Sequence, residues 1–233
     1  MVAPPSYKPV AELDESTRAD FVVRVYQHLL LAVFSFVVIE MLFFQFGLAR
    51  ATYDFLAESS GSWLLILGGF MVVSWLATNA AHDILNPSKQ YAGLFGLAAA
   101  EALIFAPILY YVLKIESDGA TTVWAAIGIT VVGFAGLSAV AYTTRKDLSF
   151  LRPMLLWGGV CALVLIVAAV LFGLELGVWF SLAMIALAGV SILYQTQSIM
   201  RRYPAEAYVG AAVQLFAAVM MLFWYVLRLV SRR

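Results

Sequence analysis

Seven long runs of apolar residues, separated by short polar turns, follow one another after residue 20. We expect them to form helices over residues 21–48, 63–80, 90–113, 122–142, 153–172, 178–197 and 207–230. A helix of about 20 apolar residues crosses a bilayer, and turn signals such as Asn86-Pro87 and Tyr203-Pro204 separate the runs. The sequence therefore predicts an all-α integral membrane protein. Its single seven-helix transmembrane domain covers residues 21–233, after a polar, disordered or surface-lying tail over residues 1–20.

The composition also indicates that the protein lies in a lipid bilayer. Hydrophobic residues make up 64% of the 233 residues and charged residues 12%, about half the charged share of a soluble domain. So few polar side chains cannot cover a water-exposed surface, so we expect the lipid bilayer to surround the protein. The formal net charge is zero, which gives no indication of a nucleic-acid partner.

The distribution of the 14 lysines and arginines predicts the orientation. With seven crossings, nine of them lie on the N-terminal side: Lys8, Arg18, Arg24, Lys89, Arg145, Lys146, Arg152, Arg201 and Arg202. Arg50, Lys114, Arg228, Arg232 and Arg233 lie on the other. The excess favours a cytoplasmic N-terminus. Arg232-Arg233 argues against it, and a re-entrant last segment would put both ends in the cytoplasm.

Glu101 is the first candidate for chemistry. It lies near the middle of the third run, after the small residues Gly93 and Gly96 and before Pro107, which removes a backbone donor. A carboxylate at this depth costs roughly 3 kcal/mol, so we expect Glu101 to line a polar cavity as a proton-titrating or cation-binding group. The alternative is a hydrogen-bonded packing residue. Glu40 carries the same two interpretations, with the packing role favoured because it lies nearer the interface.

Polar side chains also recur at one depth on several predicted helices. Alternating helix directions put them in the cytoplasmic half: Asn79, Tyr142, Gln195, Gln197 and Gln214. They could line a cytoplasm-facing cavity that leads to Glu101, or serve as interfacial anchors and interhelical hydrogen bonds. Glycines 128, 133 and 136 of the fourth run predict close helix approach there.

The loop from Thr143 to Pro153 is basic, with Arg145 and Lys146, and holds one acid, Asp147. Its cations favour a topological role, while Asp147 could instead cap the next helix.

Enzyme signatures are missing from the sequence. There is no HExxH motif, no cysteine cluster and no P-loop, and Gly136-Leu-Ser-Ala139 lacks the closing glycine of a serine-hydrolase motif. We expect no catalytic activity and no resident cofactor. Glu101 is a weak candidate for a metal ligand, since a single carboxylate with amides and carbonyls makes a weak calcium site.

Five segments, in order along the chain, resemble the bacterial members of the Bax inhibitor family, the transmembrane Bax-inhibitor-motif proteins. They are FVVRVYQHL from Phe21, AEALIFAP from Ala100, RKDLSFL from Arg145, YQTQ from Tyr194 and LFWYVLRL from Leu222. The resemblance implies a seven-helix bundle with a central last helix wrapped by the other six. It also implies a calcium leak that responds to pH.

In that family two facing aspartates on the last two helices share a proton and latch the pore. Gln195 and Ala218 stand at the corresponding positions of this chain. Neither side chain titrates, so the latch cannot exist in that form.

We therefore expect a cation leak channel or transporter of the bacterial inner membrane, with calcium as the transported ion and a pH switch altered or moved to Glu101. The alternative is a non-conducting regulator of stress or cell death that binds other membrane proteins.

Overall fold

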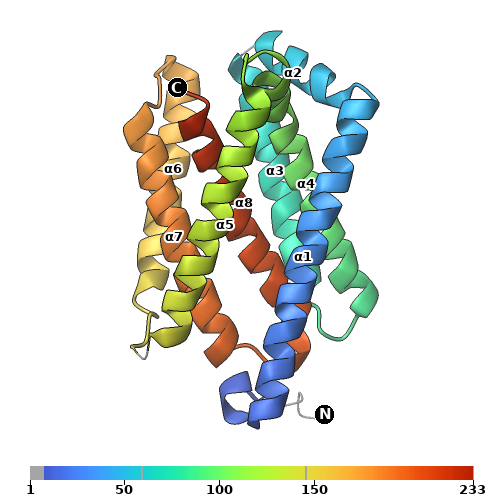
Figure 1. Cartoon of the computed structure of the whole chain (residues 1–233), viewed down its shortest axis with the longest axis vertical. Coiled ribbons are helices and arrows are strands. Elements are labelled where there is room, and N and C mark those ends of the chain that lie inside the picture. The colour runs from blue at the N-terminus through green and yellow to red at the C-terminus, as the bar shows by residue number, and fades with distance from the viewer. Residues whose placement is uncertain (1–7, 59, 145, 233) are drawn as a thin grey trace.

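The computed structural model describes residues 8–58, 60–144 and 146–232. Within these ranges it is built of helices without a β-sheet, arranged as one elongated bundle (Figure 1). The long helices are α1 (Glu15–Gln45), α3 (Ser60–Ala81), α4 (Pro87–Lys114), α5 (Gly119–Thr143), α6 (Leu151–Phe172), α7 (Val178–Arg201) and α8 (Tyr208–Val230). The short ones are η1 (Val10–Glu12), α2 (Leu48–Glu58) and η2 (Ala205–Ala207). All seven long helices are long and apolar enough to cross a membrane, which confirms the predicted fold class.

The last segment crosses the whole bundle. Helix α8 is continuous, and in Figure 1 its C-terminal end lies at the opposite end of the bundle from η1. This arrangement leaves no re-entrant turn in α8, so the alternative topology for the last segment is wrong.

The polar N-terminal segment is more ordered than the sequence predicts. Helix α1 begins at Glu15, inside the predicted tail, because the Asp14 carboxylate caps it and accepts a hydrogen bond from the Thr17 amide at 3.0 Å. Before it, Val10 is buried and its amide donates to the Tyr203 carbonyl at 2.8 Å. Residues 1–7 of the predicted tail lie outside the described residues.

Helix α2 was not predicted. It has a single buried residue, Ala49, and lies across the upper end of the bundle in Figure 1. The Tyr53 ring packs against the rings of Tyr110 and Tyr111 of α4, with centroids 5.4 and 6.4 Å away. These aromatic contacts fix α2 at the C-terminal end of α4.

Helix α8 forms the centre of the bundle. In the apolar stretch of 18 residues that qualifies α8 as a membrane span, 72% of the residues are buried, whereas the share in α6 is 6%. It packs against α1, α3, α4, α5 and α7, so the predicted central last helix is confirmed. Helix α6 is peripheral, packs mainly against α7 and α3, and wraps α8 less closely than the resemblance implies.

Helices α3 and α4 approach each other closely at Gly93. A β-carbon at Gly93 would lie 2.6 Å from the Ala81 amide nitrogen and would also clash with the Ala77 carbonyl oxygen. Of the three glycines of α5 named from the sequence, only Gly133 contacts another helix, where its β-carbon would lie 3.7 Å from the Leu222 side chain of α8. A β-carbon at Gly128 or Gly136 would have no neighbour within 4 Å, so the predicted close approach of α5 is wrong at these two positions, which face away from the other helices.

Candidate functional site

A large cavity opens among α3, α4, α6 and α8. Its volume is about 1370 Å³ and its walls are mainly apolar. Helix α6 forms one wall with residues between Leu155 and Val170, and α4 and α8 form the facing wall with side chains such as Phe105 and Trp224. The cavity exists because α6 packs against α7 and α3 and stands off from the centre of the bundle.

Glu101 of α4 reaches this cavity. The side chain is only 6% exposed, and it has no hydrogen bond or ion pair to any residue that the structure describes. One helical turn further along α4, Phe105 packs edge-on against Trp224 of α8, with ring centroids 5.0 Å apart. Glu101 thus belongs to a mainly apolar lining that also includes the polar side chains of Ser74 and Thr78 of α3.

Glu40 of α1 is buried to the same extent. It is also 6% exposed, and neither of its carboxyl oxygens has a hydrogen-bond partner among the described residues. Glu40 does not line the cavity that Glu101 lines. The two membrane-depth carboxyls thus lie in separate surroundings.

The five polar residues predicted to lead toward Glu101 are not gathered around it, because none of them lines its cavity. Asn79 is exposed at the end of α3, and Tyr142 is 42% exposed beside Tyr26 of α1. Alternation of helix direction placed these residues at one depth, but depth alone does not fix which way each helix face points.

Gln195 and Gln214 do meet. The Gln195 side-chain amide nitrogen donates to the Gln214 amide oxygen at 3.3 Å, which joins α7 to α8. Ala218, the other position named from the resemblance, is buried one turn further along α8 and is 3% exposed. The α7–α8 contact at this level is therefore made by neutral amides.

Gln197 has a different partner, the basic loop between α5 and α6. It is 3% exposed, accepts a hydrogen bond from the Leu148 amide at 2.6 Å and donates to the Lys146 carbonyl at 2.7 Å. One side chain of α7 therefore holds two backbone groups of the loop. The sequence placed Gln197 at the right depth but could not predict this partner.

Asp147 does not cap α6. Its carboxylate accepts hydrogen bonds from the Ser149 hydroxyl at 2.9 Å and amide at 3.0 Å, and it pairs with Arg202 at 3.2 Å. The Ser149 hydroxyl, then its amide, then Arg202 keep the pKa of Asp147 below the ordinary value. The capping alternative is wrong because α6 begins two residues beyond Ser149. Lys146 is exposed, and Arg145 lies outside the described residues.

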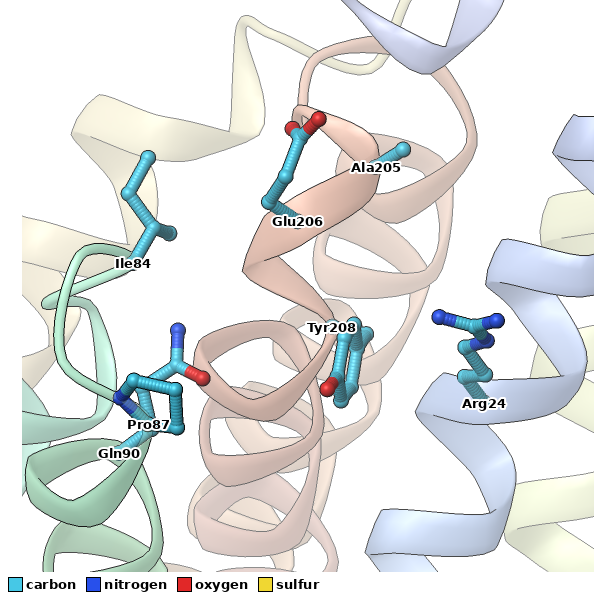
Figure 2. Close-up of a pocket in the computed structure, with 7 residues that line it drawn as sticks. All are labelled: Arg24, Ile84, Pro87, Gln90, Ala205, Glu206 and Tyr208. Carbon is cyan, nitrogen blue, oxygen red and sulfur yellow. The ribbon is translucent and has the colours of Figure 1, made fainter.

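A second, smaller pocket lies at the predicted cytoplasmic end and holds side chains that sequence reasoning did not bring together. Its volume is about 310 Å³. Figure 2 shows Tyr208 between Gln90 of α4 and Arg24 of α1. The Arg24 guanidinium lies 5.7 Å from the Tyr208 ring centroid, and the buried Gln90 amide nitrogen has no partner among the described residues. A buried glutamine in the first turn of an apolar helix was the only sequence signal for this pocket.

Next to this pocket, His28 ties α1 to α4 and α8. Its Nδ1 donates to the Arg24 carbonyl at 2.7 Å, its Nε2 bonds to the Tyr91 hydroxyl at 3.0 Å, and its ring packs 4.9 Å from that of Tyr208. No group of three or more His, Cys, Asp or Glu side chains that could hold a metal occurs among the described residues.

Comparison with known proteins gives the family. The profile of the family described as "Inhibitor of apoptosis-promoting Bax1" matches residues 18–233. The chain belongs to this Bax inhibitor family.

Relatives of this family member include bacterial membrane proteins. The "Modulator of FtsH protease YccA" of Escherichia coli K12 is 30% identical over 178 residues, which are 75% of this chain and 77% of that protein. An uncharacterized protein of Pseudomonas aeruginosa is 30% identical over 162 residues, 68% of this chain and 69% of the relative. An uncharacterized protein of Neisseria meningitidis is 27% identical over 179 residues, 75% and 76% respectively.

The family match and the seven apolar helices establish an integral membrane protein. A further Escherichia coli relative carries the name "Inner membrane protein YccA", which supports the inner membrane as the location of this Bax inhibitor family member.

Proposed function

We propose that this protein modulates an FtsH-type protease from within the inner membrane. The observation that carries the proposal is the similarity to the Escherichia coli modulator of the FtsH protease, which extends over 77% of that protein. The match covers most of both chains, so it is not confined to one motif.

The neutral contact between α7 and α8 supports a binding role. Gln195 and Gln214 join the two helices without a titratable group, so protons cannot open or close this contact between about pH 5 and 8. A helix contact that does not respond to protons suits a protein that presents a constant surface to a partner at this part of the bundle.

The loop between α5 and α6 is the surface we propose for that partner. Gln197 holds the loop backbone through two hydrogen bonds, and the Asp147–Arg202 ion pair ties the loop to the end of α7. Lys146 is exposed. A loop that only sets topology needs its positive charge but needs no buried anchor. The anchoring by Gln197 therefore favours recognition of a partner at this end of the bundle.

Co-reconstitution tests this proposal. FtsH and a reporter substrate are placed in proteoliposomes with or without this protein, and the rate of substrate degradation is measured. We expect the protein to change the rate and Lys146→Glu to weaken that effect. Lys114→Glu, the same substitution at the other end of the bundle, should leave it unchanged. A rate that does not respond to the protein would contradict the proposal.

A cation leak through Glu101 is the second candidate. The observation in its favour is the buried, unpartnered carboxyl group facing a cavity, since intramembrane carboxyls mark ion and proton pathways by default. The expected permeant ion is calcium, held weakly by one carboxylate.

Calcium uptake into proteoliposomes, measured from about pH 5 to 8, tests this second candidate. The leak predicts a pH-dependent flux that Glu101→Gln abolishes and that Glu40→Gln, the matched change outside the cavity, retains. Equal flux with and without the protein, at every pH, would contradict the leak hypothesis and leave the modulator proposal intact.

A further inference from the structure

The cavity beside α6 is too large for a closed protein interior. Interiors pack at the density of organic crystals, with few spaces larger than a water molecule, whereas this one measures about 1370 Å³. Its walls are mainly apolar, and water enters such spaces only where it finds several polar partners. Because the surrounding helices cross a membrane, lipid acyl chains are the groups that suit these apolar walls.

One end of the same cavity is cationic. Arg228 and Arg232, in the last turn of α8 and just after it, both line the cavity. Both guanidinium groups donate to the Leu176 carbonyl, at 3.1 and 2.8 Å. They therefore converge on one point at the mouth of the cavity, where the loop between α6 and α7 meets α8.

No carboxylate neutralises these two arginines among the residues that the structure describes, where the ion pairs are Arg50–Asp54, Lys89–Asp83 and Arg202–Asp147. Glu175 lies in the same wall without an ion pair to either arginine. The two cations also lie near enough to repel each other. An anion placed between them would relieve that repulsion.

We propose that the cavity binds an anionic phospholipid, with its phosphate against Arg228 and Arg232 and its acyl chains between α6 and the α4–α8 wall. Guanidinium groups suit phosphate because their paired N–H donors match its oxygens. This inference goes beyond the proposed function and does not depend on it.

The lining fits flexible chains of varying length. Met71, Met184, Met220 and Met221 lie in the walls, and methionine side chains adapt to irregular neighbours. Glu101 lines the cavity near the middle of α4, well below the arginines at its mouth. A bound lipid would therefore place acyl chains, rather than water, against the Glu101 side chain.

Native mass spectrometry of the purified full-length protein tests the proposal. The protein is mixed with dioleoyl phosphatidylglycerol or with dioleoyl phosphatidylcholine, which have the same chains but different head groups. We expect one phosphatidylglycerol to be retained in preference to phosphatidylcholine. Arg228→Gln combined with Arg232→Gln should lower this preference by roughly 30-fold, at the usual contribution per basic residue. Arg50→Gln, an arginine at the same end that pairs with Asp54, is the matched control and should change nothing.

A second variant tests the chain-binding part without removing charge. A β-carbon at Gly159 of α6 would have no neighbour within 4 Å, and the residue lines the cavity, so Gly159→Phe should fold and narrow the cavity. We expect it to reduce retention of both lipids. Equal retention of the two lipids by the unaltered protein would overturn the proposal. Unchanged retention in both the Arg228/Arg232 and the Gly159 variants would do the same, as would a tightly bound polypeptide that excludes lipid.

Discussion

At Gly93, helices α3 and α4 come so close that hydrogen is the only side chain that fits. We predict that Gly93→Ala destabilises the bundle by about 1–3 kcal/mol, the usual cost of overpacking, because a methyl group would strike the backbone of Ala77 and Ala81. Thermal unfolding in detergent measures the loss. Gly96→Ala is the matched control, since its β-carbon would meet only the Ala77 methyl at an ordinary 3.8 Å. Equal effects of the two substitutions would contradict this account of the contact.

At the residue scale, the sequence predicted which polar side chains lie at membrane depth better than it predicted their hydrogen-bond partners. Glu101, Gln195 and Gln197 stood out because polar groups are rare inside a membrane, and all three are half-buried or buried. Their partners come from segments far along the chain, such as Gln214 for Gln195 and the 146–148 backbone for Gln197. Such pairs depend on helix rotation, which apolar runs do not specify.

At the scale of elements, the α5–α6 loop is predicted to depend on Gln197. Gln197→Ala removes the hydrogen bonds to the Leu148 amide and the Lys146 carbonyl. It should cost about 1 kcal/mol because a part-buried backbone amide and a carbonyl are left without these partners. Faster tryptic cleavage after Lys146 is the expected result. Gln195→Ala, which breaks one interhelical hydrogen bond on the same helix, should leave the cleavage rate of the loop unchanged. A Gln197→Ala loop cut no faster than the unaltered one would contradict the anchoring role.

The helices themselves were largely predictable. Each predicted run lies within the corresponding long helix or overlaps most of it, because burial in lipid demands about 20 apolar residues per crossing. Helix α2 and the early start of α1 were missed for a physical reason. Helix α2 is short and half polar, and the start of α1 depends on the Asp14 cap. Neither feature leaves a long apolar run.

For the whole molecule, the family fold is combined with an uncharged α7–α8 contact and a peripheral α6. Family membership follows from the match over residues 18–233. The cavity could not be predicted from the sequence, since it reflects how far α6 stands from α8. The bundle therefore has an α7–α8 contact without a titratable group, and we propose that its α5–α6 loop meets a partner.

The most direct test is the rate at which FtsH degrades a reporter substrate in proteoliposomes, with and without this protein, at about pH 6 and pH 7.5. Because the Gln195–Gln214 contact has no titratable group, we predict that the ratio of the two rates differs from one and is the same at both pH values. A ratio of one at both pH values, or an effect present at only one of them, would contradict the account.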